Sequence, residues 1–285
     1  MPILIPNFLY SSSLPYFAHP IGYERLVLVG ASVLKLQFSC ILLDFFLCLF
    51  LRQYFLTSNT NTDPERTTRP ARPWYTFSLL TSDYPGRWFL LHAVWNVGIT
   101  IACLPDVWFT ILHPNTACEP SLSYNLMPTL MSMALHLYHV IAPWFWIKLT
   151  KEDIFHHLVF AIGGLGSISV LWSWGPGANF AFIFLTGLPG GLDYLMLGLI
   201  KLGLMEKLTE KSINSKMNAW IRGPGCTAAA VLTYAAWHGG KMGPPTAAVA
   251  LNIGLIFYNG NYYSQRVIAN EAKCRTLSKL AGKKK

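Results

Sequence analysis

Charged residues are scarce in this sequence. Only 12% of its 285 residues are Asp, Glu, Lys or Arg, about half the share found in soluble domains, whereas 53% are hydrophobic. Apolar stretches long enough to cross the hydrocarbon core of a bilayer, which takes roughly 20 residues, recur along the whole chain. The low charge therefore excludes an ordinary soluble domain, and the repeated apolar stretches predict a multi-pass, all-α membrane protein.

Cysteine motifs are also lacking, and the first residues do not show the pattern of a signal peptide. The six cysteines include no C-x-x-C, and Cys103 and Cys118 are the pair placed to form a disulfide on the oxidising side of a membrane. Residues 1–25 are apolar, but they are interrupted by prolines and have no basic n-region. We therefore expect an irregular or interfacial lead-in there, and not a signal peptide.

The apolar pattern predicts seven transmembrane helices. The first covers residues 26–52, and a cytosolic polar loop rich in Thr, Asn, Pro and Arg follows over residues 53–87. A six-helix domain then covers residues 88–266, and residues 267–285 form a basic cytosolic tail. Within the domain we expect spans at residues 88–112, 122–147, 151–174, 179–202, 219–237 and 244–263.

The basic residues predict how these helices are oriented. All but three of the 22 Lys and Arg residues fall in alternate loops and in the tail; the exceptions are Arg25, Lys35 and Lys241. Because loops rich in Lys and Arg stay on the cytosolic side, we expect the N-terminus to face the lumen or exterior and the C-terminus to face the cytosol. The net charge of +9 is then an orientation signal and predicts no nucleic-acid partner.

Six of the seven predicted spans carry a polar side chain at a similar depth. Each such residue lies seven to nine residues from a cytosolic span end, about 10–14 Å along a helix. The six residues are Asp44, Asn96, His139, His157, Asp193 and Asn259. Ionisable groups at such depth normally face a bundle interior or a wet cavity. We interpret the set as a polar layer that lines a cavity open to the cytosolic leaflet, with interhelical hydrogen bonding as the alternative.

Histidines concentrate on the helical hairpin at residues 135–158, LHLYHVIAPWFWIKLTKEDIFHHL. His136 and His139 precede its charged turn, and the adjacent His156 and His157 follow it. Histidine suits general acid–base chemistry near neutral pH. His136, His139 and His157 could together supply three nitrogen ligands, but no acidic or cysteine ligand is spaced to complete such a site, so we expect no metal.

These patterns assign roles to individual residues. We expect the catalytic groups to be His156, His157 and Asp193. We expect the substrate-binding groups to be His136, His139, Asp44, Asn96 and Asn259, and His92 is a further candidate. In the fifth span, Leu188-Pro189-Gly190-Gly191 frees backbone carbonyls in mid-membrane, which predicts either the wall of a binding site or a packing kink.

The hairpin and the final span also carry a family resemblance. A short basic turn leads into D-x-x-H-H at Asp153, His156 and His157, and the final span ends in Asn259-Gly-Asn-Tyr-Tyr-Ser-Gln-Arg. This combination resembles the TLC-domain family, which includes the ceramide synthases and related lipid-handling proteins of the endoplasmic reticulum. The resemblance covers residues 87–273. It implies that the last six helices ring a cavity as a TLC-like barrel, with His156 and His157 matching the paired histidines of the family.

The same resemblance implies ligands and a location. It predicts membrane lipids as partners, acyl-CoA as a candidate co-substrate, no bound cofactor and an endoplasmic reticulum membrane. Asp193 stands alone where ceramide synthases have H-D-x-x-D, and Phe160 occupies a position where they have Thr. These departures favour a less specialised lipid role than N-acylation. His136 and His139 in L-H-x-Y-H are also similar to the H-x-x-H-H of fatty-acid elongases, but Val140 replaces the last histidine.

Three classes of function follow from the sequence. The first is a lipid-modifying or lipid-binding membrane protein with a histidine-containing cavity open toward the cytosolic leaflet. The alternative is a non-catalytic accessory subunit of a larger membrane complex, in which the polar layer only joins helices. A seven-helix receptor ranks last, because the seventh span has no Lys for a retinal Schiff base. The sequence leaves open whether the protein is an enzyme.

Overall fold

The computed structural model describes residues 23–58, 84–141, 151, 157 and 166–282. Every regular element in these ranges is helical, which confirms the all-α prediction. Three of the helices are long and apolar enough to cross a membrane: residues 26–55, 87–112 and 177–201. Their length and composition agree with a multi-pass membrane protein.

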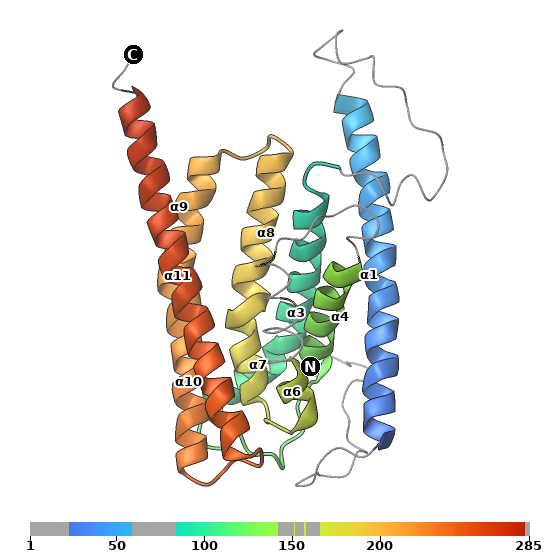
Figure 1. The fold of residues 1–285 in the computed structure, drawn as a ribbon, viewed down its shortest axis with the longest axis vertical. Coiled ribbons are helices and arrows are strands. Elements are labelled where there is room, and N and C mark those ends of the chain that lie inside the picture. Colours follow the sequence, from blue (N-terminus) through green and yellow to red (C-terminus); the bar gives the residue numbers. More distant parts are fainter. Residues whose placement is uncertain (1–22, 59–83, 142–150, 152–156, 158–165, 283–285) are drawn as a thin grey trace.

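The helices lie side by side and roughly parallel to the long axis of the molecule (Figure 1). The N-terminal half supplies α1 (Tyr23–Ser58), α3 (Arg87–Leu112), α4 (Met127–Ile141) and α6 (Ser167–Leu171). The C-terminal half supplies α7 (Gly177–Phe182), η4 (Ile183–Gly187), α8 (Leu188–Lys201), α9 (Lys207–Met217), η5 (Asn218–Arg222), α10 (Gly223–His238) and α11 (Thr246–Gly282).

Two of the long rods contain a π-helical turn. The first rod joins α7, η4 and α8, and the second joins α9, η5 and α10, each without a break. Pro189 follows η4 by two residues and Pro224 follows η5 by two residues. Proline has no backbone N–H to donate to the preceding turn, and a wider turn accommodates the resulting defect while the helix continues. The predicted break at residues 188–191 is therefore a local defect inside a continuous helix.

Helix α3 lies at the centre of the N-terminal half. Leu91, Trp95 and Ile99 on α3 pack with residues of α1, α4 and the α7–η4 rod in one apolar cluster. On the side of α3 that faces α8, glycines allow a close approach: a Cβ atom added at Gly198 would lie 2.8 Å from Cδ2 of Leu90. Small residues are the usual means by which membrane helices approach each other.

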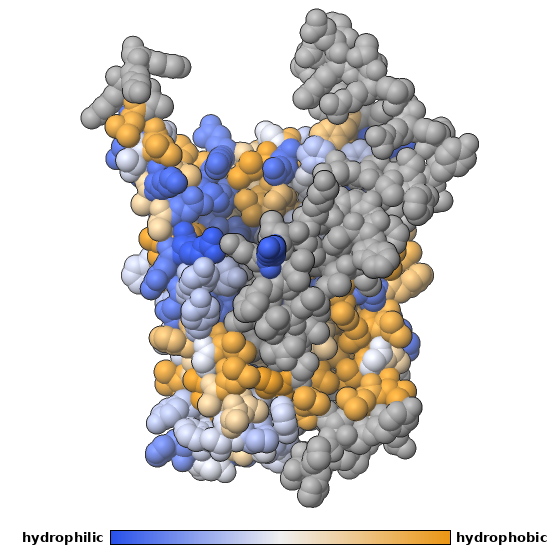
Figure 2. Space-filling view, viewed as in Figure 1, coloured by the Kyte–Doolittle hydropathy of each residue, from blue (hydrophilic) through white to orange (hydrophobic). Residues whose placement is uncertain are grey.

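The surface also fits a membrane setting. Leu34, Phe38 and Phe46 of α1 are 71%, 62% and 61% exposed. Figure 2 shows hydrophobic side chains over α1 and in a band across the lower half of the bundle, and hydrophilic side chains over the upper part near α9 and α11. Exposed apolar surface of this extent marks contact with lipid or with another protein.

The predicted boundaries agree best where the chain is most apolar. Helix α3 coincides with the second predicted span, and α7–η4–α8 with the fifth. The fourth predicted span, residues 151–174, lies mostly outside the described residues. The sixth and seventh were predicted too short, because α9 starts at Lys207 and α11 continues to Gly282. Hydropathy detects only apolar residues, and neither α9, which packs against α11, nor the end of α11 is apolar enough to be detected.

Candidate functional site

Histidine and tyrosine rings from separate segments meet in the upper half of the bundle. The ring of His92 on α3 lies 4.3 Å from that of Tyr194 on α8, centroid to centroid, and α3 packs against α4, which carries His136. The ring of His136 lies 5.3 Å from that of His157. We call His92, His136, His157 and Tyr194 the histidine–tyrosine cluster. It contains two of the histidines that the sequence predicted on the hairpin, and it adds His92.

Backbone contacts fix the tautomer of two of these rings. Nδ1 of His92 lies 2.6 Å from the carbonyl oxygen of Trp88, and Nδ1 of His136 lies 2.6 Å from that of Ser132. A carbonyl oxygen can only accept, so Nδ1 must carry the proton in both rings. In a neutral ring Nε2 then has the lone pair.

A buried ion pair lies close to this cluster along the same helices. Asp44 on α1 and Arg87 at the start of α3 are both fully buried, and Arg87 donates from Nε to Oδ1 of Asp44 over 2.7 Å. Nη2 of Arg87 and the hydroxyl of Tyr138 on α4 both donate to Oδ2 of Asp44. One carboxylate thus joins three helices. Arg87 and Tyr138 are therefore the donors to the two oxygens of Asp44.

Asn96 and the fifth predicted span meet at the contact between α3 and the α7–η4–α8 rod. Thr186 in η4 donates to Oδ1 of Asn96 over 2.9 Å. A Cβ atom at Gly190 would lie only 2.9 Å from Nδ2 of Asn96, so the glycine makes room for the amide. This arrangement explains Asn96 as an interhelical contact, as the alternative reading of the polar layer proposed.

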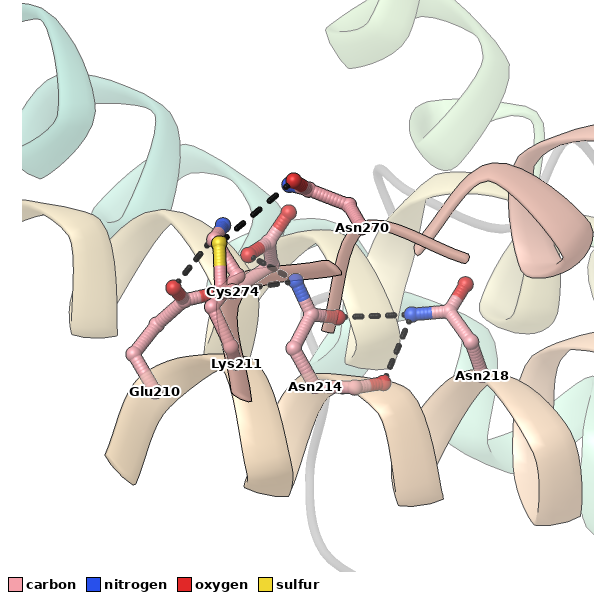
Figure 3. A network of polar contacts seen from close by, with 7 residues as sticks. Glu210, Lys211, Asn214, Asn218, Asn270 and Cys274 are labelled. Atoms are coloured by element: carbon pink, nitrogen blue, oxygen red, sulfur yellow. Dashed lines mark hydrogen bonds and ion pairs between the residues drawn. The ribbon is translucent and has the colours of Figure 1, made fainter. Parts of the chain in front are cut away.

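Asp193 belongs to a polar network on α8, α9 and α11, shown in Figure 3. Nδ2 of Asn214 donates to Oδ1 of Asp193 over 2.6 Å and to Oε1 of the fully buried Glu210 over 3.1 Å. Lys211 pairs with the other oxygen of Glu210 at 2.9 Å. Asn218 donates to Oδ1 of Asn214 over 2.6 Å. Asn214 is therefore a donor to Asp193.

The carbonyl freed by Pro189 has a partner of its own. Leu185 lies four residues before Pro189. In a regular α-helix its carbonyl oxygen would accept a hydrogen bond from the backbone N–H of residue 189, which proline lacks. Nη2 of Arg222 in η5 donates to that carbonyl oxygen over 2.8 Å. The two π-helical turns are thus joined by a side chain. This satisfies a backbone group that would be costly to leave unpaired in an apolar setting.

Another buried carboxylate, Asp106, lies toward the end of α3 opposite to Arg87. Oδ2 of Asp106 accepts a hydrogen bond from the backbone N–H of Asn125 over 2.9 Å and from Nδ2 of Asn179 over 2.6 Å. The same Nδ2 reaches the carbonyl oxygen of Asn125 over 2.6 Å. This cluster holds the loop after α3 against the start of the α7–η4–α8 rod.

The thiols and a small cavity lie toward that end as well. Cys103 and Cys118 are both buried and free, so the disulfide considered from the sequence is not formed. Burial raises the pKa of the Cys118 thiol to about 12. A cavity of about 20 Å³, enough for one water molecule, is lined by residues including Cys118, Trp174, Thr233 and Asn252. No histidine lines this cavity, so it is separate from the histidine–tyrosine cluster.

The members of the predicted polar layer have different partners. Asp44 contacts Arg87, the completely buried first residue of α3. Asn96 lies nine residues further along that helix, about 13 Å away along the axis, and contacts Thr186. His156 and the side chain of His139 lie outside the described residues. Asn259 is buried on α11, apart from the histidine–tyrosine cluster.

The sequence analysis missed several residues of the site. Tyr138, Tyr194 and Asn214 have no role in the sequence prediction, yet each contacts a predicted residue. A tyrosine two residues from His136 on an apolar helix was the available signal for Tyr138. Asn214 lies on α9, which hydropathy did not identify. Among the residues the structure describes, no three His, Cys, Asp or Glu side chains form a group that could hold a metal ion.

Comparisons with known proteins add no assignment. No protein-family model matches the chain, and neither the curated proteins nor the solved structures contain a match to it. The function must therefore be argued from the chemistry of the site alone.

Proposed function

We propose that this protein is a seven-pass membrane protein that binds or modifies a lipid at the histidine–tyrosine cluster. The cluster combines three imidazoles and a phenol from α3, α4, α8 and the segment around His157, beside helices apolar enough to cross a membrane. We further propose that the N-terminus faces the lumen or exterior, that the C-terminus faces the cytosol, and that the last six helices form a TLC-like barrel in the endoplasmic reticulum.

The observation that supports this most directly is the shared tautomer of His92 and His136. Each ring donates from Nδ1 to a backbone carbonyl of its own helix, so Nε2 carries the lone pair of the ring. A lipid hydroxyl or amine placed against Nε2 would donate a hydrogen bond or a proton to it. His157, in ring contact with His136, would hold or return that proton. Acyl-CoA is a candidate co-substrate for such a reaction.

The test is lipid retention by the purified full-length protein. Lipids that co-purify in a mild detergent would be identified by mass spectrometry for the wild type, His136→Gln and His157→Gln. His113→Gln and His238→Gln provide matched controls, because both of these histidines are exposed at the opposite end of the bundle. We expect a specific lipid in the wild type and both controls and its loss from the two cluster variants.

The alternative is an accessory subunit, and the Asp44 site favours it. Both oxygens of this carboxylate are taken by donors from α3 and α4, so its role in the described structure is to join helices. If the polar groups serve only this purpose, the cluster variants will retain the same lipids as the wild type. The protein would then co-purify with a fixed set of membrane proteins. That result would reject the lipid-site proposal.

A further inference from the structure

We propose that a phospholipid headgroup binds between Arg222 and Arg266, on a platform formed by Tyr258, Tyr262 and Tyr263 of α11. The ligand recognised is a phosphate group, and its source is an anionic phospholipid of the surrounding bilayer. The site is distinct from the histidine–tyrosine cluster and does not depend on the function proposed for that cluster.

Two arginines lie against neighbouring tyrosine rings of α11. The guanidinium carbon of Arg222 lies 5.4 Å from the ring centroid of Tyr263, and that of Arg266 lies 5.5 Å from the ring of Tyr262. The two tyrosine rings contact each other at 5.3 Å, and Tyr258 stacks on Tyr262 at 5.1 Å. Arginine over an aromatic face keeps the edge of its guanidinium available for hydrogen bonding.

The positive charge of this platform is not neutralised by an ion pair. Among the described side chains, neither Arg222 nor Arg266 has a carboxylate within ion-pair distance, although Asp193 acts on Arg222 at longer range. Each guanidinium lies against one of two tyrosine rings that are themselves in contact. Two like charges at one aromatic pair repel each other unless an anion lies between them.

Polar atoms at the site remain available to a ligand. Nη2 of Arg222 is bonded to the carbonyl oxygen of Leu185, but its Nε has no partner among the described residues. One turn before Tyr263, the side chain of Asn259 is only 6% exposed and its Oδ1 likewise lacks a partner within the described part of the chain. Arginine and phosphate form charge-assisted hydrogen bonds that are about twice as strong as neutral ones.

The surroundings favour a lipid as the source of the phosphate. Tyr258 and Tyr262 are 55% and 37% exposed, so the platform is open from the side of the bundle. Phe257 on α11 and Trp220 in η5 are 51% and 80% exposed, so both helices also present apolar surface to acyl chains. Figure 2 shows hydrophilic side chains on the upper part of the bundle above an apolar band, the arrangement that a lipid at a membrane surface requires.

The experiment measures lipid binding by the full-length protein in nanodiscs. Nanodiscs of phosphatidylcholine alone would be compared with nanodiscs that also contain phosphatidic acid, and inorganic phosphate would be titrated into the former. Native mass spectrometry counts retained phosphatidic acid. We expect the wild type to retain phosphatidic acid at a fixed stoichiometry, and Arg266→Gln to bind it at least tenfold more weakly. Saturation by inorganic phosphate at micromolar concentration would instead overturn the lipid assignment.

Further variants separate binding from folding. Arg222→Lys keeps a cation that can donate to the carbonyl oxygen of Leu185 but removes the planar guanidinium group. We therefore expect weaker phosphatidic acid binding with an unchanged melting temperature. Lys279→Gln is the matched control, since it removes one positive charge from the same helix away from the tyrosines. Equal retention by Arg266→Gln and Lys279→Gln would overturn the proposal. His136→Gln should leave phosphatidic acid binding unchanged. A failure of the function proposed for the histidine–tyrosine cluster would therefore be distinguished from a failure of the phosphate site.

Discussion

Arg87 and Asp44 form an ion pair that is completely shielded from solvent, although they are 43 residues apart in the sequence. The pair joins α1 to α3, and Tyr138 adds α4 to the same carboxylate. Bringing two charges out of water is costly, and only their mutual attraction and the added hydrogen bond offset that cost. The pair therefore determines how α1 is placed against the bundle.

Loss of one member of this pair should destabilise the protein strongly. We expect Arg87→Gln to lower the free energy of unfolding by about 3–5 kcal/mol, because it leaves the Asp44 carboxylate buried without its counter-ion. Thermal unfolding in detergent would measure the change. Arg275→Gln breaks a pair with Glu271 in which Arg275 is 57% exposed, so it should cost less than about 1 kcal/mol. Equal losses for the two variants would contradict the role given to burial.

The contact between α10 and α11 depends on the absence of a side chain at Gly260. A Cβ atom at this position would lie 2.3 Å from Cβ of Cys226, whereas one at Gly254 on the same helix meets nothing within 4 Å. We expect Gly260→Ala to cost about 1–3 kcal/mol through overpacking. Gly254→Ala should be neutral or stabilising, because alanine favours the helix. The two melting temperatures in detergent would test this, and a shared shift would refute the close contact.

The Asp106 cluster provides a third test. Asn179→Ala removes both hydrogen bonds from Nδ2, to Asp106 and to the carbonyl of Asn125, and leaves buried acceptors with fewer donors. We expect a loss of about 1–3 kcal/mol in the free energy of unfolding. Asn115→Ala serves as the control, since that side chain is exposed. Denaturant titration followed by circular dichroism measures both, and no loss for Asn179→Ala would show that the cluster does not stabilise the loop.

Thiol labelling should distinguish Cys118 from Cys274. The pKa of Cys118 is raised to about 12 by burial, so its reactive thiolate is scarce at pH 8 and increases only as the pH approaches that value. Cys274 is partly exposed on α11. We expect iodoacetamide at pH 8 to alkylate Cys274 within minutes and to leave Cys118 unmodified, as read by peptide mass spectrometry. Fast alkylation of Cys118 would contradict its burial.

The sequence predicted the helical class and the positions of α3 and of the α7–η4–α8 rod, because hydropathy summed over about 20 residues is a local property. It also drew attention to His136 and His157, which the structure brings into ring contact. It failed on α9, which packs against α11, and on the second half of α11. Neither of these two segments is apolar enough to be detected by composition.

The sequence by itself determined which stretches are apolar enough to be embedded in a membrane and which polar residues lie within them. Only the tertiary structure decided the partners: Arg87 for Asp44, Asn214 for Asp193, and Arg222 for the carbonyl that Pro189 leaves free. The physical reason is that a buried polar group takes whichever donor the packing brings within about 3 Å. Packing between helices depends on residues far apart in the chain, which no local pattern encodes.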